Sequence, residues 1–322
     1  MATTAVLEPN SGDQVNAGRK SPAGSGRRSD GKRGERWAPW LLMAPTLIVL
    51  ALMTIVPAVY LLYASFRSDT LLGPPGRFIG LTNYTSTLSD PTFWHSLLIT
   101  VAFVAVAVIL EMAVGLLLAI PLAAQTRSNT WGTTLLLLPF AITPVVSAMI
   151  FKEMLNPNYG WIDYFMGVIG LPSNIEWLSH PSTAWIALIG LDVWQWTPFV
   201  ALILIAGIQS LPLEPREAAS IDGATPWQTF RHITLPQLMP FVAIALVLRT
   251  IQAFKTFDAF KIMTGGGPGD STEIINLGIY RVALQSFRIG AASAVAILLL
   301  IILSFLVPAL LRGVGRNANP EA

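Results

Sequence analysis

The sequence predicts an all-α fold, a polytopic membrane protein with six transmembrane helices, and two observations carry this prediction. Of the 322 residues, 53% are hydrophobic and only 12% are charged, whereas a soluble domain carries about 25% charged residues. Six apolar runs also reach the length of about 20 residues that a helix needs to cross a bilayer. We expect these spans at about 38–66, 97–124, 132–151, 184–208, 238–260 and 291–311.

Polar segments flank the transmembrane domain, which we place at residues 37–313. Residues 1–36 are rich in Gly, Ser, Lys and Arg, and this composition predicts a disordered basic tail. Because this long polar stretch precedes the first apolar run, we do not interpret it as a signal peptide. Residues 314–322 are predicted to form a second, shorter tail.

The distribution of Lys and Arg predicts the orientation of the chain. The tail before the first span carries Arg19, Lys20, Arg27, Arg28, Lys32, Arg33 and Arg36, whereas the loop after that span carries only Arg67 and Arg77. Since basic residues concentrate in cytoplasmic loops, we expect a cytoplasmic N-terminus, and six crossings return the C-terminus to the same side. The loops 67–96, 152–183 and 261–290 then face outward, and the segment 212–236 faces the cytoplasm.

Several functional classes are disfavoured by composition. The net charge of +2 gives no reason to expect a nucleic-acid partner, and the absence of Cys removes thiolate chemistry and Cys-based zinc sites. The three histidines, His95, His180 and His232, lie far apart and show no metal-ligand spacing. No GxSxG, HExxH or GxxxxGK[ST] motif occurs. We therefore expect no metal site, no catalysis and no ATP hydrolysis on this chain.

The segment between the fourth and fifth spans is charged and predicts a helix–turn–helix. Pro215 suits the first turn of a helix, where its missing N–H is not needed. Glu217 then lies near the positive end of the helix dipole. Ala218 and Ala219 are small enough to let another backbone approach, and Asp222-Gly223 is a turn signal.

A second short helix is predicted after this turn. Thr225 is a candidate N-cap, Pro226 the first helical residue and Gln228 the partner in a capping box. Trp227, Phe230 and Ile233 recur every three residues and form an apolar stripe, and Pro236 is expected to end the helix. Spacing alone fits two interpretations, a surface that docks into a partner's cleft and an amphipathic loop that lies on the membrane.

Polar side chains within the predicted spans are candidates for a translocation cavity, because ionisable groups at membrane depth usually face a cavity or a partner. The set comprises Glu111, Asp192, Gln195, Arg249, Gln252 and Thr256, with Lys255 and Asp258 nearer the outer end. The alternative is internal ion pairing, such as Glu111 with Arg249. Trp194 and Trp196 could stack on a sugar ring, although packing is the commoner role. Arg249 and Lys255 could counter an anionic solute, or Arg249 could pair with an acid.

The charged segment also resembles a known motif. Glu217-Ala218-Ala219, Asp222-Gly223-Ala224 and Ile233-x-Leu235-Pro236 resemble the EAA motif of ABC importer permeases. Five further stretches resemble the carbohydrate-uptake branch, which includes the maltose and glycerol-phosphate permeases: FIGLTNY (Phe78–Tyr84), DPTFW (Asp90–Trp94), LLPFAITP (Leu137–Pro144), WQWTPF (Trp194–Phe199) and TGGGPGDST (Thr264–Thr272). The resemblance covers roughly residues 38–311.

The resemblance implies a function and a set of partners. Segment 212–236 would couple the permease to a separate ABC ATPase dimer, which carries ATP and Mg, through Glu217, Ala218, Ala219, Asp222, Gly223, Ala224, Phe230, Ile233, Leu235 and Pro236. A second permease subunit would complete the pathway. Gly265, Gly266, Gly267 and Pro268 would face an extracytoplasmic solute-binding protein.

The implied setting is the cytoplasmic (inner) membrane and its lipid. The implied solute is a sugar or a sugar-like compound, including polyols, oligosaccharides and sugar phosphates or sulfonates. The alternative is an ATPase-independent secondary transporter. That class has no need for the helix–turn–helix and often shows two similar halves, which we do not find in this sequence.

Overall fold

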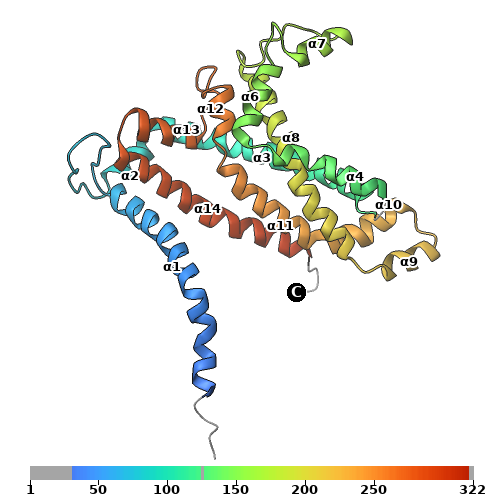
Figure 1. Cartoon of the computed structure of the whole chain (residues 1–322). Coiled ribbons are helices and arrows are strands. Elements are labelled where there is room, and N and C mark those ends of the chain that lie inside the picture. The colour runs from blue at the N-terminus through green and yellow to red at the C-terminus, as the bar shows by residue number, and fades with distance from the viewer. Residues whose placement is uncertain (1–30, 125–126, 319–322) are drawn as a thin grey trace, which may run out of the picture. The chain divides into compact units, whose positions relative to one another are not determined.

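The computed structural model describes residues 31–124 and 127–318, which are mostly helical (Figure 1). The chain divides into two units, and the boundary between Pro57 and Ala58 falls inside α1 (Gly31–Ser65). Within the described ranges, five helical segments are long and apolar enough to cross a membrane: Trp40–Ser65 in α1, α3 (Pro91–Leu122), α8 (Pro181–Ser210), Pro226–Met263, and Ile289–Ala309 in α14 (Ile289–Ala318).

The predicted tails are partly helical. α1 begins at Gly31, so residues 31–36 are not the disordered tail that the composition predicted. Lys, Arg and Glu are good helix formers, and a helix that must span the following apolar run can extend backward through them. α14 likewise continues to Ala318. The remainder of both predicted tails, residues 1–30 and 319–322, lies outside the described residues.

The prediction of one continuous third helix over 132–151 is wrong. The segment forms α4 (Arg127–Leu136), α5 (Leu138–Ala141) and α6 (Pro144–Met154). Ile142 and Thr143 are extended, with ψ angles of 137° and 143°, because a proline, here Pro144, disfavours helical geometry in the residue before it. The interruption leaves the carbonyl of Ile142 without a helical partner, and Gln195 on α8 donates to it from Nε2 at 2.9 Å.

Pro236 does not end the second helix of the charged segment. α10 (Pro226–Thr229), the π-helix η1 (Phe230–Thr234) and α11 (Leu235–Phe254) follow one another without a break. The Leu235 N–H bonds to the Phe230 carbonyl, five residues back, and this wider turn gives the proline ring room that an α-helical turn lacks. The helix stops instead at Lys255–Phe257, and α12 (Asp258–Met263) follows.

Five further short helices in the described ranges complete the unit: α2 (Thr82–Ser89), α7 (Trp161–Val168), α9 (Glu214–Ile221), α13 (Ile275–Tyr280) and the π-helix η2 (Arg281–Gln285). α3 packs along α8, and α11 lies against α3, α8 and α14. Glycines allow this close approach: a Cβ on Gly115 would lie 2.8 Å from Cγ1 of Val200, and one on Gly207 would lie 2.6 Å from the ring of Phe241. Small residues at helix contacts are typical of membrane bundles.

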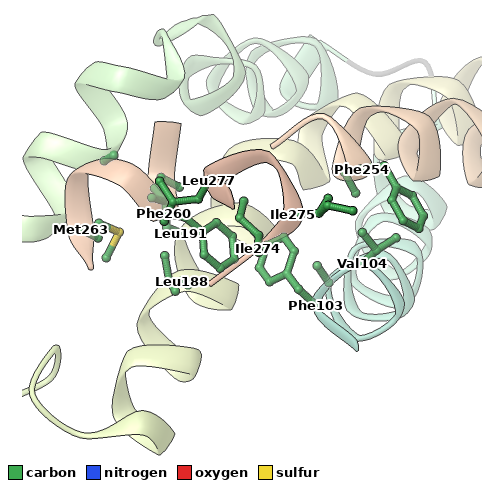
Figure 2. Packing of buried hydrophobic residues seen from close by; sticks show 14 of the residues in the cluster. Phe103, Val104, Leu188, Leu191, Phe254, Phe260, Met263, Ile274, Ile275 and Leu277 are labelled. Carbon is green, nitrogen blue, oxygen red and sulfur yellow. The ribbon is translucent and has the colours of Figure 1, made fainter. Parts of the chain in front are cut away.

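The segment after α11 folds back into the core. Figure 2 shows Phe103 of α3, Leu188 of α8 and Phe260 of α12 in one apolar cluster with Ile274 and Ile275. The rings of Phe103 and Phe260 meet edge to face with centroids 4.7 Å apart. α12 and the start of α13 are therefore packed against the long helices, although the sequence predicted an outward loop from residue 261.

Candidate functional site

A buried ion triad joins three of the long helices. Nη2 of Arg249 on α11 donates to Oε1 of Glu111 on α3 at 2.8 Å, and the same guanidinium also bonds to Asp192 on α8. All three side chains are buried, and Arg249 is 1% exposed. The pairing of Glu111 with Arg249, which the sequence analysis gave as the alternative to a cavity role, is present, and Asp192 is a second acid on the same arginine that the sequence analysis did not pair with it. A charge-paired contact at membrane depth fixes α3, α8 and α11 to one another at this point.

The two tryptophans of α8 pack against protein. The guanidinium carbon of Arg249 lies 5.0 Å above the ring centroid of Trp196, and the ring of Phe140 lies edge to face with Trp196 at 5.6 Å. Trp194 instead contacts Phe151, with centroids 5.1 Å apart. These contacts favour the packing interpretation over a sugar-stacking platform.

A pocket of about 230 Å³ opens beside the triad. Its lining includes seven of the residues that the sequence predicted for a cavity: Asp192, Gln195, Arg249, Gln252, Lys255, Thr256 and Asp258. Glu111 and Trp194 do not line it. Trp196, Pro144, Leu191, Phe257 and Ala259 complete the wall. The structure thus gathers most of the predicted cavity residues into one place.

The polar residues of this pocket fall into two groups. Arg249 donates a hydrogen bond to Asp192, and Gln195 donates one to the Ile142 carbonyl, so these three side chains already have partners within the protein. The side chains of Gln252, Lys255 and Asp258 make no hydrogen bond or ion pair to any residue in the described ranges. The second group is therefore available to a bound molecule. Across those same ranges, no group of His, Asp and Glu side chains is arranged to hold a metal ion.

The predicted turn between the two short helices is present. α9 ends at Ile221 with Asp222 as its C-cap, and Gly223 has a φ of +79°, a conformation that glycine adopts without strain. The Ala224 N–H bonds to the Ala219 carbonyl at 2.9 Å and the Gly223 N–H to the Ser220 carbonyl at 3.2 Å, which together form a Schellman motif. The turn therefore has defined geometry and presents α10 at a fixed angle to α9.

The predicted capping box at α10 is confirmed. The Thr225 N–H donates to Oε1 of Gln228 at 2.8 Å, and the Gln228 N–H donates to Oγ1 of Thr225 at 3.3 Å. Trp227 and Phe230 lie together, with ring centroids 5.7 Å apart. Of the residues predicted for coupling, Glu217, Ala218, Asp222, Gly223 and Pro236 are exposed, Ala219 is buried, and Ala224, Phe230, Ile233 and Leu235 are half-buried.

Two exposed apolar residues of this segment were missed by the sequence analysis. Leu213, which directly precedes α9, and Ile221, its last residue, have exposed fractions of 61% and 86%, and Trp227 on α10 is 66% exposed. The sequence did indicate them, because both are isolated apolar residues in an otherwise polar loop. They make the surface of the helix–turn–helix more apolar than the motif residues alone suggested.

The glycine-rich loop after α12 is held in place by the core. Gly265 and Gly266 have φ angles of +60° and +98°, and Nη2 of Arg281 donates to the Gly265 carbonyl at 2.5 Å. Nε1 of Trp185 donates to the Ser271 carbonyl at 2.9 Å. Gly266 is buried, Gly265, Gly267 and Pro268 are half-buried, and the exposed loop residues are Gly269 and Asp270.

An acidic group lies behind this loop. Glu273 is buried, and its Oε2 lies 3.1 Å from Nη1 of Arg281. Burial raises the pKa of Glu273, and the nearby Arg281 partly opposes this effect. The carboxyl group therefore binds its proton more tightly in the folded protein than in the unfolded chain.

The fold and these features define a helical membrane protein with a polar pocket between its spans and a helix–turn–helix joined to one of them. The family described as "Binding-protein-dependent transport system inner membrane component" matches residues 91–318, and the chain belongs to this family.

Similar proteins place the chain in the carbohydrate-uptake branch of the ABC permeases. It is 36% identical over 264 residues to the trehalose/maltose transport system permease protein MalF of Thermococcus litoralis, covering 82% of this chain and 89% of the relative. It is 35% identical over 288 residues to the sulfoquinovosyl glycerol transport system permease protein SmoG of Agrobacterium fabrum, covering 84% and 92%. The sn-glycerol-3-phosphate permease UgpA of Agrobacterium fabrum is 32% identical over 267 residues, covering 82% and 90%.

A solved structure shares the fold. A chain from a bacterial alginate ABC transporter, in complex with a periplasmic protein bound to an alginate pentasaccharide, superposes with a TM-score of 0.76. The match covers 88% of this chain and 96% of that one, at 22% sequence identity.

Proposed function

We propose that this chain is one of two permease subunits of an ATP-driven importer and that it forms, with the second subunit, the pathway for a sugar or sugar-like solute. The observation that carries the proposal is the continuity of one helix with both candidate sites. α10, η1 and α11 follow without interruption from the helix–turn–helix to Arg249 and Gln252 at the pocket. The names of the relatives, which are sugar and sugar-derivative permeases, support the solute class.

The arrangement of the partners follows from the same features. The broken segment α4–α6 makes the sixth crossing, so both termini are cytoplasmic and the protein lies in the cytoplasmic membrane. Exposed Leu213, Ile221 and Trp227, with the EAA residues, dock in a groove of an ATPase subunit that holds ATP and Mg. The outward segments, with Gly269 and Asp270 exposed, receive the solute-binding protein.

A second permease subunit completes the pathway. The pocket of about 230 Å³ in this chain is smaller than the 300–1,000 Å³ that small-molecule sites typically occupy. A related chain that packs against exposed apolar helix faces would supply the remaining wall and close the site to lipid.

The mechanism is alternating access between two states. ATP closes the ATPase dimer, and each docked helix–turn–helix moves with its subunit. Because α10 continues into α11, the displacement reaches the pocket as a rigid motion and not as a loop rearrangement. The side of the membrane to which the pocket opens then depends on the state of the ATPase.

Gentle-detergent purification of the chain from its host tests this proposal. We expect an ATPase with a Walker motif and a second membrane-spanning permease to purify with it, and ATP to drive solute uptake in liposomes. Gly223→Asp should leave the complex in the membrane but abolish uptake and the solute-stimulated ATPase activity, because it alters the turn that orients α10. A chain that purifies alone and moves solute without ATP would instead support a secondary transporter.

A further inference from the structure

The charged side chains of the pocket differ in whether their hydrogen-bonding and ionic capacity is already used by partners within the protein. Arg249 is the strongest anion-binding group in the spans, but its Nε and Nη2 atoms donate to Glu111 and Asp192 and its plane lies over Trp196. With 1% of its surface exposed, it cannot offer a solute anion the paired hydrogen bonds by which arginine usually binds phosphate or sulfonate. The triad therefore stabilises the helices and does not serve as an anion site.

The remaining charges disfavour an anion. Lys255 and Asp258 line the pocket on either side of the break between α11 and α12, and neither has an ionic partner in the described part of the chain. The lining carries two carboxyl groups, from Asp192 and Asp258, and two cations, from Arg249 and Lys255, and Asp192 is already paired with Arg249. A bound phosphate could approach Lys255 only while it also meets the unpaired carboxylate of Asp258, which repels it.

A hydroxyl group has no such conflict. It can accept a hydrogen bond from the ammonium of Lys255 and donate one to the carboxylate of Asp258, and the amide of Gln252 can do both. These three side chains have no other partner in the described part of the chain, so a ring of hydroxyls would satisfy them. The pattern matches the chemistry of an uncharged polyol or sugar.

We propose that the pocket selects uncharged polyhydroxylated solutes over solutes that carry a phosphate or sulfonate, and that Asp258 is the residue that sets this preference. The inference rests on the proposed function and narrows its solute class. Relatives named for anionic solutes, such as UgpA, show that the fold itself does not impose this choice. The unpaired carboxylate of Asp258 in the pocket lining decides it.

Equilibrium binding to the purified permease complex, without the solute-binding protein, tests the inference. The probes are matched pairs that differ by one phosphate: glucose with glucose 6-phosphate, and glycerol with glycerol 3-phosphate. We expect the neutral member to bind at least about tenfold more tightly, since one unit charge at about 10 Å and an effective dielectric constant near 20 changes affinity by about that factor.

Three variants assign the effect to the pocket. Asp258→Asn should reduce the preference to near equality, because it removes the unpaired carboxylate and leaves Lys255. Lys255→Gln should increase the preference for the neutral probe. Glu153→Gln is the matched control, because Glu153 is an exposed acid that accepts a hydrogen bond from Tyr159 outside the pocket, and it should change nothing.

Two results would overturn the inference: tighter binding of the phosphorylated member in either pair, or no binding of any neutral probe. An unchanged preference in Asp258→Asn would remove Asp258 from the explanation. None of these results alters the proposed function, which is tested separately by ATPase co-purification and ATP-driven uptake. A complex that imports solute with ATP and binds glycerol 3-phosphate more tightly than glycerol would thus keep the function and refute the selectivity.

Discussion

Replacing Arg249 with Met tests whether the buried triad stabilises the folded protein. The guanidinium is 1% exposed and donates three charge-assisted hydrogen bonds to Glu111 and Asp192. Its removal leaves two buried carboxyl groups without a counter-charge, and breaking a buried ion pair in this way costs about 3–5 kcal/mol. Because whole proteins are stable by only about 5–15 kcal/mol, we expect Arg249→Met to lower both the free energy of unfolding and the amount of assembled protein.

The assay is reversible unfolding in mixed detergent micelles, followed by tryptophan fluorescence. The matched control is a triple variant, Glu111→Leu, Asp192→Leu and Arg249→Met, which removes every charge of the triad. Replacing a buried ion network by apolar residues is often neutral or stabilising, so the triple variant should recover most of the lost stability. If the single variant lowers the free energy of unfolding by less than about 1 kcal/mol, or if the triple variant is no more stable than the single one, the triad does not have this stabilising role.

Two further predictions concern packing and pH. Gly115→Ala should lower the stability of the protein by about 1–3 kcal/mol, because the new Cβ lies 2.8 Å from Val200. Gly190→Ala is the control, because a Cβ at Gly190 meets no atom within 4 Å. Equal losses of stability in the two variants would contradict the packing argument. Since the pKa of Glu273 is raised by burial above its ordinary value of 4.5, the folded state gains protons relative to the unfolded chain, and stability should fall as pH rises through this raised pKa. Thermal unfolding across that range should show the slope in the wild type and lose it in Glu273→Gln, whereas a slope that persists would assign the effect to another group.

The sequence predicted those features that local chemistry determines. The Asp222-Gly223 turn and the Thr225–Gln228 capping box depend on residues a few positions apart, and both are present. The pairing of Glu111 with Arg249 was also predictable, because a buried charge needs an opposite charge. Part of the pocket was predictable because the period of a helix places Arg249 and Gln252 on one face of α11, whereas Thr256, expected on the same face, lies in the break after the helix ends.

The features that were missed depend on contacts between distant residues. Pro139 and Pro144 were visible, but a break within the third apolar run needs a donor for the freed Ile142 carbonyl, and that donor is Gln195 on another helix. The return of α12 and α13 to the core likewise depends on a bond from the Ile275 N–H to Oγ1 of Thr100 on α3. Hydropathy cannot distinguish such a packed segment from an exposed loop.

The triad and the break at Lys255–Phe257 together determine how motion can spread if α10 docks as proposed. Phe230 and Arg249 lie on one continuous helix, about 28 Å apart along its axis at 1.5 Å per residue. A displacement of α10 therefore reaches the triad, where the bonds to Glu111 and Asp192 require α3 and α8 to move with α11. Beyond the triad the helix is interrupted, so α12 can stay with its neighbour α6 while α11 moves.

The pocket should consequently change shape on its α12 side. Paired spin labels on α11 and α12 should report a distance change between the ATP-bound and nucleotide-free importer, whereas labels on α3 and α8 should keep their distance. The Arg249→Met, Glu111→Leu, Asp192→Leu variant removes the bonds that tie these helices, so the second distance should then also vary with nucleotide. A constant α11–α12 distance in the wild type would show that the motion enters the pocket by another route.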